Sequence, residues 1–180
     1  VYSFPATIWE GTDGLNMIEV YLPTLLRGTV VTIEVTLLSI ILAFLVAFVF
    51  GLGRLSKYAV VRGISYVVVE FIRGTSLMVQ LFWLYFVLPF FGIELPSLAA
   101  GVLAIGLNYG AYGSEIVRSS ILAVPKGQTE ASVVLNMTPW QRMRHIIIPQ
   151  AMMRMIPPFG NLSIELLKGT SLVSFISLND

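Results

Sequence analysis

The segment Thr29–Leu52 is an apolar run that contains a single charged residue, Glu34. A helix that crosses the hydrocarbon of a bilayer needs about 20 consecutive, mostly apolar residues, so this run is long enough for one span. The rest of the chain has the same character, because 56% of its residues are hydrophobic and 12% are charged, whereas soluble domains are about 25% charged. The sequence therefore predicts an all-α, polytopic membrane protein.

Further apolar segments follow the first one. Tyr58–Phe91 is too long for one straight span and contains Glu70 and Arg73, Leu95–Val117 is one span long, and Ile146–Ile176 is again over-long. These segments predict about four transmembrane helices in a single transmembrane domain over residues 1–180. The sequence leaves open whether residues 58–72 cross the membrane or lie along its inner face.

Basic residues in short loops indicate the cytoplasmic side of a membrane protein. Eight of the 11 Lys and Arg residues fall in or next to two loops: Arg54, Lys57, Arg62, Arg118, Lys126, Arg142, Arg144 and Arg154. The N-terminal segment instead carries Glu10, Asp13 and Glu19. We therefore predict that residues 1–28 are external, and that residues 118–149 form a cytoplasmic loop.

Composition excludes several kinds of chemistry. The chain has no cysteine and one histidine, His145, so we expect no metal site and no thiol chemistry. The net charge of +1 gives no reason to expect a nucleic-acid partner. The N-terminus lacks the basic region of a cleavable signal peptide. Neither a His-Glu-x-x-His motif nor paired aspartates occur, so no catalytic residue is predicted.

A short phrase occurs twice, as EFIRGTSL from Glu70 and as ELLKGTSL from Glu165. Both copies follow a basic loop, so we expect them to run in the same direction. Gly74 and Gly169 weaken a helix, and the Thr-Ser pair that follows can cap a new one, so each copy predicts a helix break. Two interpretations of the charges stay open: they form i,i+3 ion pairs, or they border a polar pathway.

The basic loop has its own local signals. Gln128–Leu135 predicts a short helix, Asn136 a left-handed turn, and Thr138 with Pro139 and Gln141 a capping box that starts a second helix. The loop also carries several large apolar residues: Val133, Val134, Leu135, Met137 and Trp140. So much apolar surface on a free cytoplasmic loop favours a protein partner over a solvated connector.

This loop resembles the EAA motif of permease subunits in bacterial ABC importers, and the matching positions are Glu130, Ala131, Ser132, Asn136, Ile146, Ile148 and Pro149. FIRGTSLMVQLFWLYFVLP, AYGSEIVRSSILAVPKGQTEAS and PPFGNLSIELLKGTSLVS are similar to segments of the polar amino acid uptake branch. The resemblance runs from about Leu25 to the last residue. Ser132 and Asn136 depart from the usual Ala and Gly, and Ser76 and Gly169 from the common Pro and Asp.

The resemblance implies a type I ABC importer permease fold, in which two permeases pair around a central pathway, and a fifth helix beyond residue 180. It implies a multi-pass protein of the bacterial cell membrane whose partners are a dimer of ABC ATPase subunits, a second permease, identical or paralogous, and an extracytoplasmic solute-binding protein. The chain has no P-loop, so ATP and Mg²⁺ are expected on the ATPase, with no cofactor in this chain. The implied ATPase-coupling residues are Glu130, Ala131, Ser132, Leu135, Asn136, Arg142 and Pro149.

The implied function is ATP-driven import of polar amino acids or related zwitterionic solutes. A zwitterion needs a cation and an acid, and the candidate residues of the substrate pathway are Glu70, Arg73, Asn108, Tyr109, Glu115, Glu165 and Lys168. We expect Gly106, Gly110 and Gly113 to serve helix packing instead. The alternatives are an ABC permease for another solute, such as ectoine-like osmolytes or opines, and an ATP-independent secondary transporter.

Overall fold

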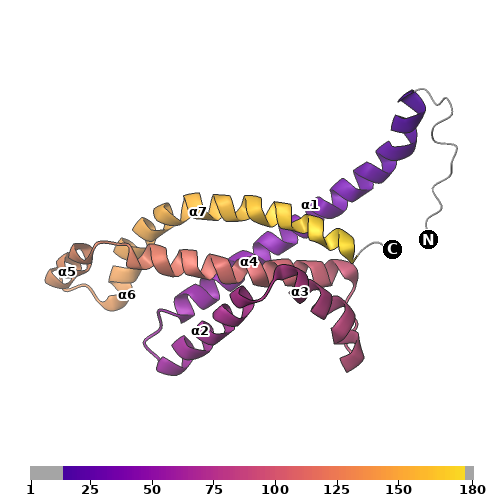
Figure 1. Ribbon diagram of the computed structural model, residues 1–180. Helices are drawn as coiled ribbons and strands as arrows, with labels where there is room; N and C mark the ends of the chain where they lie inside the picture. Colours follow the sequence, from indigo (N-terminus) through magenta and orange to yellow (C-terminus); the bar gives the residue numbers. More distant parts are fainter. Residues whose placement is uncertain (1–13, 177–180) are drawn as a thin grey trace. The chain divides into compact units, whose positions relative to one another are not determined.

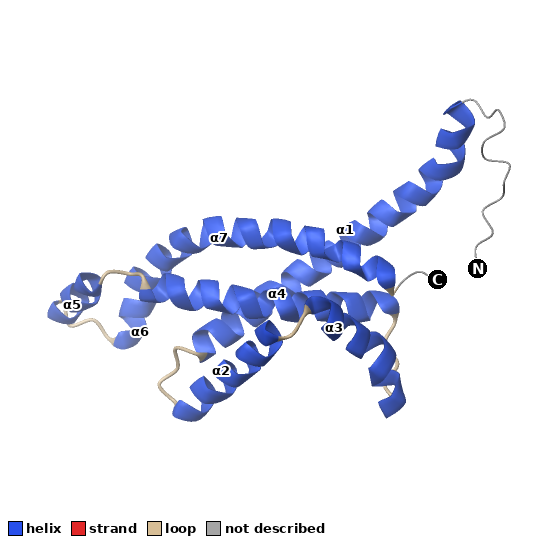
Figure 2. Ribbon diagram, viewed as in Figure 1, coloured by secondary structure: helices blue, strands red, loops and turns tan. Residues whose placement is uncertain are grey.

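The computed structural model describes residues 14–176, and the regular structure of this range is helical throughout, without strands (Figure 2). The chain divides into two compact units, Val1–Glu34 and Val35–Asp180. The first helix, α1 (Gly14–Gly53), contributes residues to both units. Each unit is described separately below.

The first unit contains the beginning of α1. Its described side chains, from Tyr21 onward, are exposed and largely apolar, and the Thr32 hydroxyl donates to the carbonyl oxygen of Gly28 at 2.8 Å. Residues 1–13 of the predicted external segment lie outside the described residues, and residues 14–28 are helical. The predicted helix over Thr29–Leu52 is confirmed as part of α1.

The second unit contains the remaining helices (Figure 1), which are α2 (Ala59–Gly74), α3 (Leu77–Phe82), the π-helical turn η2 (Trp83–Val87), the 3₁₀ turn η3 (Leu88–Phe91), α4 (Ser97–Leu122), α5 (Lys126–Val134), α6 (Pro139–Arg142), the π-helical turn η4 (Met143–Ile147), α7 (Ile148–Gly169) and the 3₁₀ segment η5 (Thr170–Phe175). The helices α4 and α7 run side by side, and α2 and α3 both contact α4. Because α4 contacts α2, α3, α7, η2 and η5, its buried residues form the centre of this unit.

Small residues let α1 approach α4 closely. Gly106, Gly110 and Gly113 lie against Leu42, Val46 and Ala47. A Cβ atom placed at Gly110 would lie 2.6 Å from the Cβ of Val46, so only glycine permits this separation. The predicted packing role of the three glycines is therefore confirmed, since Gly-x-x-x-Gly spacing allows such backbone approach.

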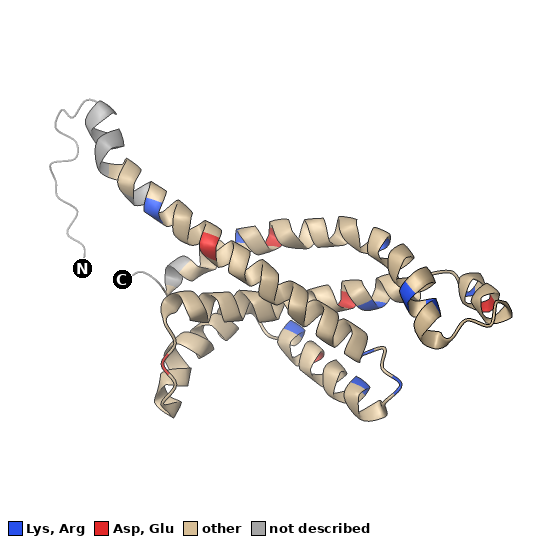
Figure 3. Cartoon of the chain, turned by 180° about the vertical axis from the view of Figure 1, so that it is seen from behind, with Lys and Arg blue, Asp and Glu red and all other residues tan. Residues whose placement is uncertain are grey.

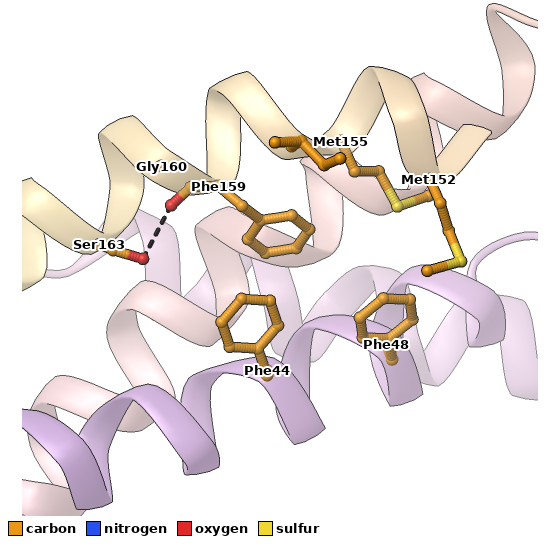
Figure 4. Close-up of a pocket in the computed structure, with 8 residues that line it drawn as sticks. Phe44, Phe48, Met152, Met155, Phe159, Gly160 and Ser163 are labelled. Carbon is orange, nitrogen blue, oxygen red and sulfur yellow. Dashed lines mark hydrogen bonds between the residues drawn. The ribbon is translucent and has the colours of Figure 1, made fainter. Parts of the chain in front are cut away.

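Aromatic side chains join α1 to α7. The ring of Phe159 stacks on Phe44, with centroids 4.7 Å apart, and on Phe48 at 6.2 Å (Figure 4). Beside them lies an apolar cavity of about 320 Å³ that Met152 and Met155 also line. This seam places α7 along α1 and α4, which brings the second copy of the repeated phrase next to α4.

The first copy of the phrase contains the predicted break. Helix α2 ends at Gly74, Thr75 and Ser76 are extended, and α3 begins at Leu77, so the chain bends by 99°. Ser76 occupies the N-cap position, although its hydroxyl makes no capping hydrogen bond. The break is therefore confirmed, while its cap differs from the expected one.

The predicted break in the second copy is wrong. Gly169 keeps helical dihedral angles and the chain continues from α7 into the 3₁₀ segment η5. The hydroxyl of Thr170 donates to Leu167 O at 2.6 Å, and that of Ser171 to Lys168 O at 2.8 Å. These bonds return to the preceding helical turn, so the Thr-Ser pair continues the helical path instead of starting a new direction.

The described residues contain one helix, Tyr21–Gly53, that is long and apolar enough to cross a membrane, and a second one if the bent pair Ala59–Gly74 and Leu77–Phe91 counts as one span. The expected number of about four spans stays a prediction, because α4 and α7 are more polar. The α1–α2 loop lies at the C-terminal end of α4, since Arg54 pairs with Glu115 at 2.9 Å. Basic residues of both predicted cytoplasmic loops thus gather at one end of α4 (Figure 3), and the side of the membrane on which this end lies stays a prediction.

Candidate functional site

Three of the predicted pathway residues belong to an ion-pair cluster at the C-terminal end of α4. Glu70 contacts Arg73 at 3.4 Å and Arg54 at 3.6 Å, and Glu115 contacts Arg54 at 2.9 Å and Arg118 at 2.5 Å. The cluster therefore alternates three arginines with two glutamates. It ties α2, the α1–α2 loop and α4 together, which supports the ion-pair interpretation for the first copy of the phrase.

Arg54 connects the two halves of this cluster. Its side chain is only 9% exposed and also lies over the ring of Tyr66, 5.3 Å from the centroid. Sequence reasoning counted Arg54 as a topology marker and did not select it as a site residue. Its position directly after a long apolar helix and a glycine was the available signal, and only the fold shows that it reaches both glutamates.

A polar cavity of about 380 Å³ lies between the break, α4 and α7. It is lined by Thr75, Ser76, Leu77, Asn108, Tyr109, Tyr112 and Glu165. Three predicted pathway residues, Asn108, Tyr109 and Glu165, are therefore brought together here with the Thr-Ser pair of the first copy. Glu165 is the single charged residue in the lining.

Hydrogen bonds join the walls of this cavity. The hydroxyl of Tyr109 donates to the backbone carbonyl of Glu165 at 2.9 Å, linking α4 to α7. The hydroxyl of Tyr112 donates to Arg73 O at 3.4 Å, and the guanidinium of Arg73 lies 5.2 Å from the centre of the Tyr112 ring. The ion-pair cluster and the cavity are thus neighbours that share the Arg73–Tyr112 contact.

The second copy of the phrase differs from the first in its charges. Among the described residues, no ion pair joins Glu165 to Lys168, and both side chains are exposed. Lys168 belongs neither to the cluster nor to the cavity lining. The polar-pathway interpretation therefore fits Glu165, and the ion-pair interpretation fits Glu70.

Gln80 is a polar residue that sequence reasoning missed. Its Nε2 atom donates to Ile72 O at 2.7 Å and to Thr75 Oγ1 at 2.6 Å, and its Oε1 atom accepts from Asn108 at 3.3 Å. An amide in the otherwise apolar run LMVQLFWLYF was the signal that could have identified it.

The helix–turn–helix between α4 and α7 forms as predicted. Helix α5 ends before Asn136, whose φ of 52° makes it the one non-glycine residue with positive φ in the described range. Thr138 and Gln141 form the capping box, with 2.9 Å from the Thr138 nitrogen to the Gln141 amide oxygen, and Pro139 is the first residue of α6. Local sequence signals thus predicted the turn and the cap of this segment.

The predicted coupling residues lie in two environments on this segment. Glu130, Ala131, Leu135, Asn136 and Pro149 are exposed, and Arg142 is half-buried. Ser132 is buried, and its hydroxyl donates to Thr129 O at 2.6 Å. It therefore faces the interior of the chain, whereas the others are accessible or partly accessible to a partner.

Several apolar side chains on this segment are exposed to solvent. Val133, Val134, Leu135 and Trp140 are 57%, 82%, 71% and 69% exposed, and Met137 is half-buried. This surface, defined by Val133, Val134, Leu135 and Trp140, is called the loop patch below. Large exposed apolar side chains that gather on a polar segment are typical of interaction sites, so these residues are candidates for contact with a partner.

The described fold is a helical unit in which a helix pair, α5 and α6, lies between α4 and α7, and comparisons with known proteins specify the class of protein. Residues 39–180 match the family described as "Binding-protein-dependent transport system inner membrane component". The chain therefore belongs to this family, in the branch of amino-acid ABC transporter permeases.

Individual relatives agree with this assignment. The chain is 49% identical over 166 residues to the "Probable amino-acid ABC transporter permease protein y4tF" of Sinorhizobium fredii, which covers 89% of this chain and 70% of the relative. It is 44% identical over 154 residues to the "L-cystine transport system permease protein TcyB" of Bacillus subtilis, covering 86% and 66%. The chain thus spans about two thirds of the length of these relatives.

A solved structure supports the fold. The chain superposes on a protein in the "Crystal structure of an amino acid ABC transporter with histidines" with a TM-score of 0.85 and 37% identity, covering 92% of this chain and 77% of that one. The relatives are transport permeases, which agrees with the prediction of a transport subunit instead of an enzyme.

Proposed function

We propose that this chain is the membrane-spanning permease subunit of an ATP-driven, binding-protein-dependent importer for polar amino acids or related zwitterionic solutes. Membership of the family supports a transport role in an inner membrane. The observation that supports coupling to an ATPase is the loop patch, a set of exposed apolar side chains on the helix pair at the basic end of α4.

The loop patch is the surface for the ABC ATPase. Val134 and Leu135 are 82% and 71% exposed, so they bury apolar area when a partner covers them. Glu130 on the same helix supplies a charged contact. Asn136 fixes the turn through its left-handed conformation, and Ser132 holds α5 from the inside. Closure of the ATPase on ATP and Mg²⁺, which that partner binds, would then move this helix pair and the permease between inward- and outward-facing states.

The polar cavity is the solute pathway of this subunit. Its lining offers a carboxylate at Glu165 and polar groups at Asn108 and Tyr109, within a space of about 380 Å³, which is the size range of small-molecule sites. Two permeases, identical or paralogous, would face each other around a shared pathway, and a solute-binding protein would deliver the solute from outside.

The topology follows the same proposal. The N-terminus is outside, both basic loops are cytoplasmic, and the chain crosses the membrane about four times. The names of the relatives favour an amino acid as solute, since one relative is named for amino acids and another for L-cystine. A permease for another small zwitterion, such as an ectoine-like osmolyte or an opine, is the second candidate.

Variants of the loop patch test the coupling. In the complete transporter, Glu130→Ala and Val134→Asp should each lower ATP-dependent uptake at least about tenfold, which corresponds to ~1.4 kcal/mol, and should reduce co-purification of the ATPase. Arg144→Ala is the control, because Arg144 is an exposed charge of the same segment outside the predicted coupling set. If the first two variants retained full uptake and full ATPase co-purification, the assignment of this surface would be wrong.

A further inference from the structure

The side chain of Gln80 joins three segments that meet at the helix break. It lies on α3, its Nε2 atom donates to the last turn of α2 at Ile72 O and to the break itself at Thr75 Oγ1, and its Oε1 atom contacts α4 at Asn108. The carbonyl groups at the end of a helix have no partner within that helix. Ile72 O accepts from the Thr75 N–H at 3.4 Å and from the Thr75 hydroxyl at 3.1 Å, and Gln80 adds the shortest of these bonds, at 2.7 Å, from beyond the point where the chain bends by 99°, so it stabilises the end of α2.

The same bonds determine the orientation of Asn108. Both partners on the Nε2 side of Gln80 are oxygen atoms, so the amide nitrogen must point toward them and Oε1 must point toward α4. Only the Nδ2 group of Asn108 can donate to that oxygen, at 3.3 Å. The Oδ1 atom of Asn108 then accepts no hydrogen bond from the described residues, and Asn108 lines the polar cavity.

Three of the four hydroxyl groups around the cavity use their protons within the chain, whereas the fourth, that of Ser76, makes no capping hydrogen bond and keeps its proton for other partners. Tyr109 donates to Glu165 O, Tyr112 to Arg73 O, and Thr75 to Ile72 O. Toward a solute they offer lone pairs, and Glu165 adds a carboxylate. The wall between Asn108 and Glu165 is therefore rich in acceptors, which suits an ammonium group, because that group has three donors and no acceptor.

We propose that Gln80 is a positioning residue: it holds the break between α2 and α3 and turns the carbonyl oxygen of Asn108 into the cavity, so that this wall binds the ammonium end of a solute. The effect on solute binding rests on the proposed function of the cavity, whereas the effect on the break does not.

Direct binding tests the role in recognition. The permease–ATPase complex is placed in nanodiscs without the solute-binding protein, and titration calorimetry measures the dissociation constants of two probes. L-Alaninamide has an ammonium group but no carboxylate, and N-acetyl-L-alanine has a carboxylate but no ammonium group. The wild type should bind L-alaninamide more tightly. Gln80→Leu should weaken L-alaninamide binding about fivefold, from the loss of one oriented hydrogen bond, and should change N-acetyl-L-alanine binding less than about twofold.

A conservative variant separates recognition from mere stability. Gln80→Glu keeps an oxygen that accepts from Asn108 but loses the donors to Ile72 and Thr75, so L-alaninamide should bind at least as tightly as in the wild type. Asn161→Leu is the matched control, because it removes an exposed amide that makes no hydrogen bond with the described residues. It should leave both probes unchanged.

Spin labels test the break itself. The chain has no cysteine, so labels at Val67→Cys in α2 and Phe90→Cys in η3, residues that are 64% and 89% exposed, report the bend by pulsed electron resonance. Gln80→Leu and Gln80→Glu should both broaden the distance distribution, and Asn161→Leu should not.

The outcomes distinguish the two claims. An unchanged distance distribution in Gln80→Leu overturns the role at the break, and an equal loss of both probes in that variant overturns the orientation of Asn108. If the wild type binds neither probe while Gln80→Leu still broadens the distribution, the role at the break stands, and the proposed function of the cavity is what fails.

Discussion

Gly110→Ala is a sharp test of how α1 and α4 pack. The new Cβ atom would lie 2.6 Å from both Cβ and Cγ1 of Val46 and 3.1 Å from the carbonyl oxygen of Ala43. Two of these atoms, the Val46 Cβ and the Ala43 oxygen, are fixed to the α1 backbone, so rotation of a side chain cannot relieve the contact. The helices must separate instead.

The expected cost follows from two opposing terms. Overpacking of a close contact costs about 1–3 kcal/mol, and the rigid neighbours place this case near about 3 kcal/mol. Alanine favours the helix by about 1 kcal/mol relative to glycine. The net loss in the free energy of unfolding should therefore be about 2 kcal/mol.

Reversible unfolding of the purified permease in mixed detergent micelles measures this loss. Gly63→Ala is the matched control, because Gly63 lies in helix α2 and a Cβ there would have no atom within 4 Å. That control should keep or raise the stability. If Gly110→Ala were as stable as Gly63→Ala, the close approach of α1 to α4 would be refuted.

Three further predictions follow from other contacts. Arg54→Met removes the guanidinium that lies 2.9 Å from Glu115, so it should lower the free energy of unfolding by about 1–3 kcal/mol. This range is below that of a fully buried ion pair because Glu115 is partly exposed, and an unchanged denaturation midpoint would contradict it. Thr138→Ala removes the cap of α6 and costs about 1 kcal/mol locally, visible as faster amide exchange there, and unchanged exchange would count against the capping box. Glu165→Gln should lower uptake about tenfold, whereas Lys168→Gln should leave it nearly unchanged, and equal effects would remove Glu165 from the pathway.

Local signals in the sequence were sufficient where a segment's structure depends on its own residues. The capping box at Thr138 and the left-handed Asn136 are found where the sequence predicts them, because each uses bonds or dihedral angles within a few residues. The packing role of Gly110 was also predictable, since small-residue spacing on an apolar helix has one common use.

Tertiary contacts decided what the sequence could not. The two copies of Gly-Thr-Ser are the same, yet only the first breaks its helix, where Gln80 bonds the freed end of α2. In the second copy Gly169 packs beside Tyr109, with 2.7 Å from a hypothetical Cβ to the tyrosine hydroxyl, and the helical path continues. The residues of the repeated phrase itself do not distinguish these two outcomes.

The candidate site was predicted in part for the same reason. Glu70 and Glu165 were selected because charged residues are rare in this sequence, but their partners come from distant segments. Arg54 contacts Glu70, whereas Glu165 lines a cavity with Asn108. The sequence therefore identified residues of the site, and the fold assigned them to an ion-pair cluster and to a polar cavity.

Uptake by the reconstituted transporter tests the central claim most directly. The permease is placed in proteoliposomes with its ATPase, ATP is enclosed on the ATPase side, and the solute-binding protein is added on the other side with radiolabelled amino acids. The account predicts accumulation that requires both ATP and the binding protein and that Glu130→Ala abolishes or strongly reduces. Accumulation of the same solute by the permease alone, without ATPase or ATP, would contradict it.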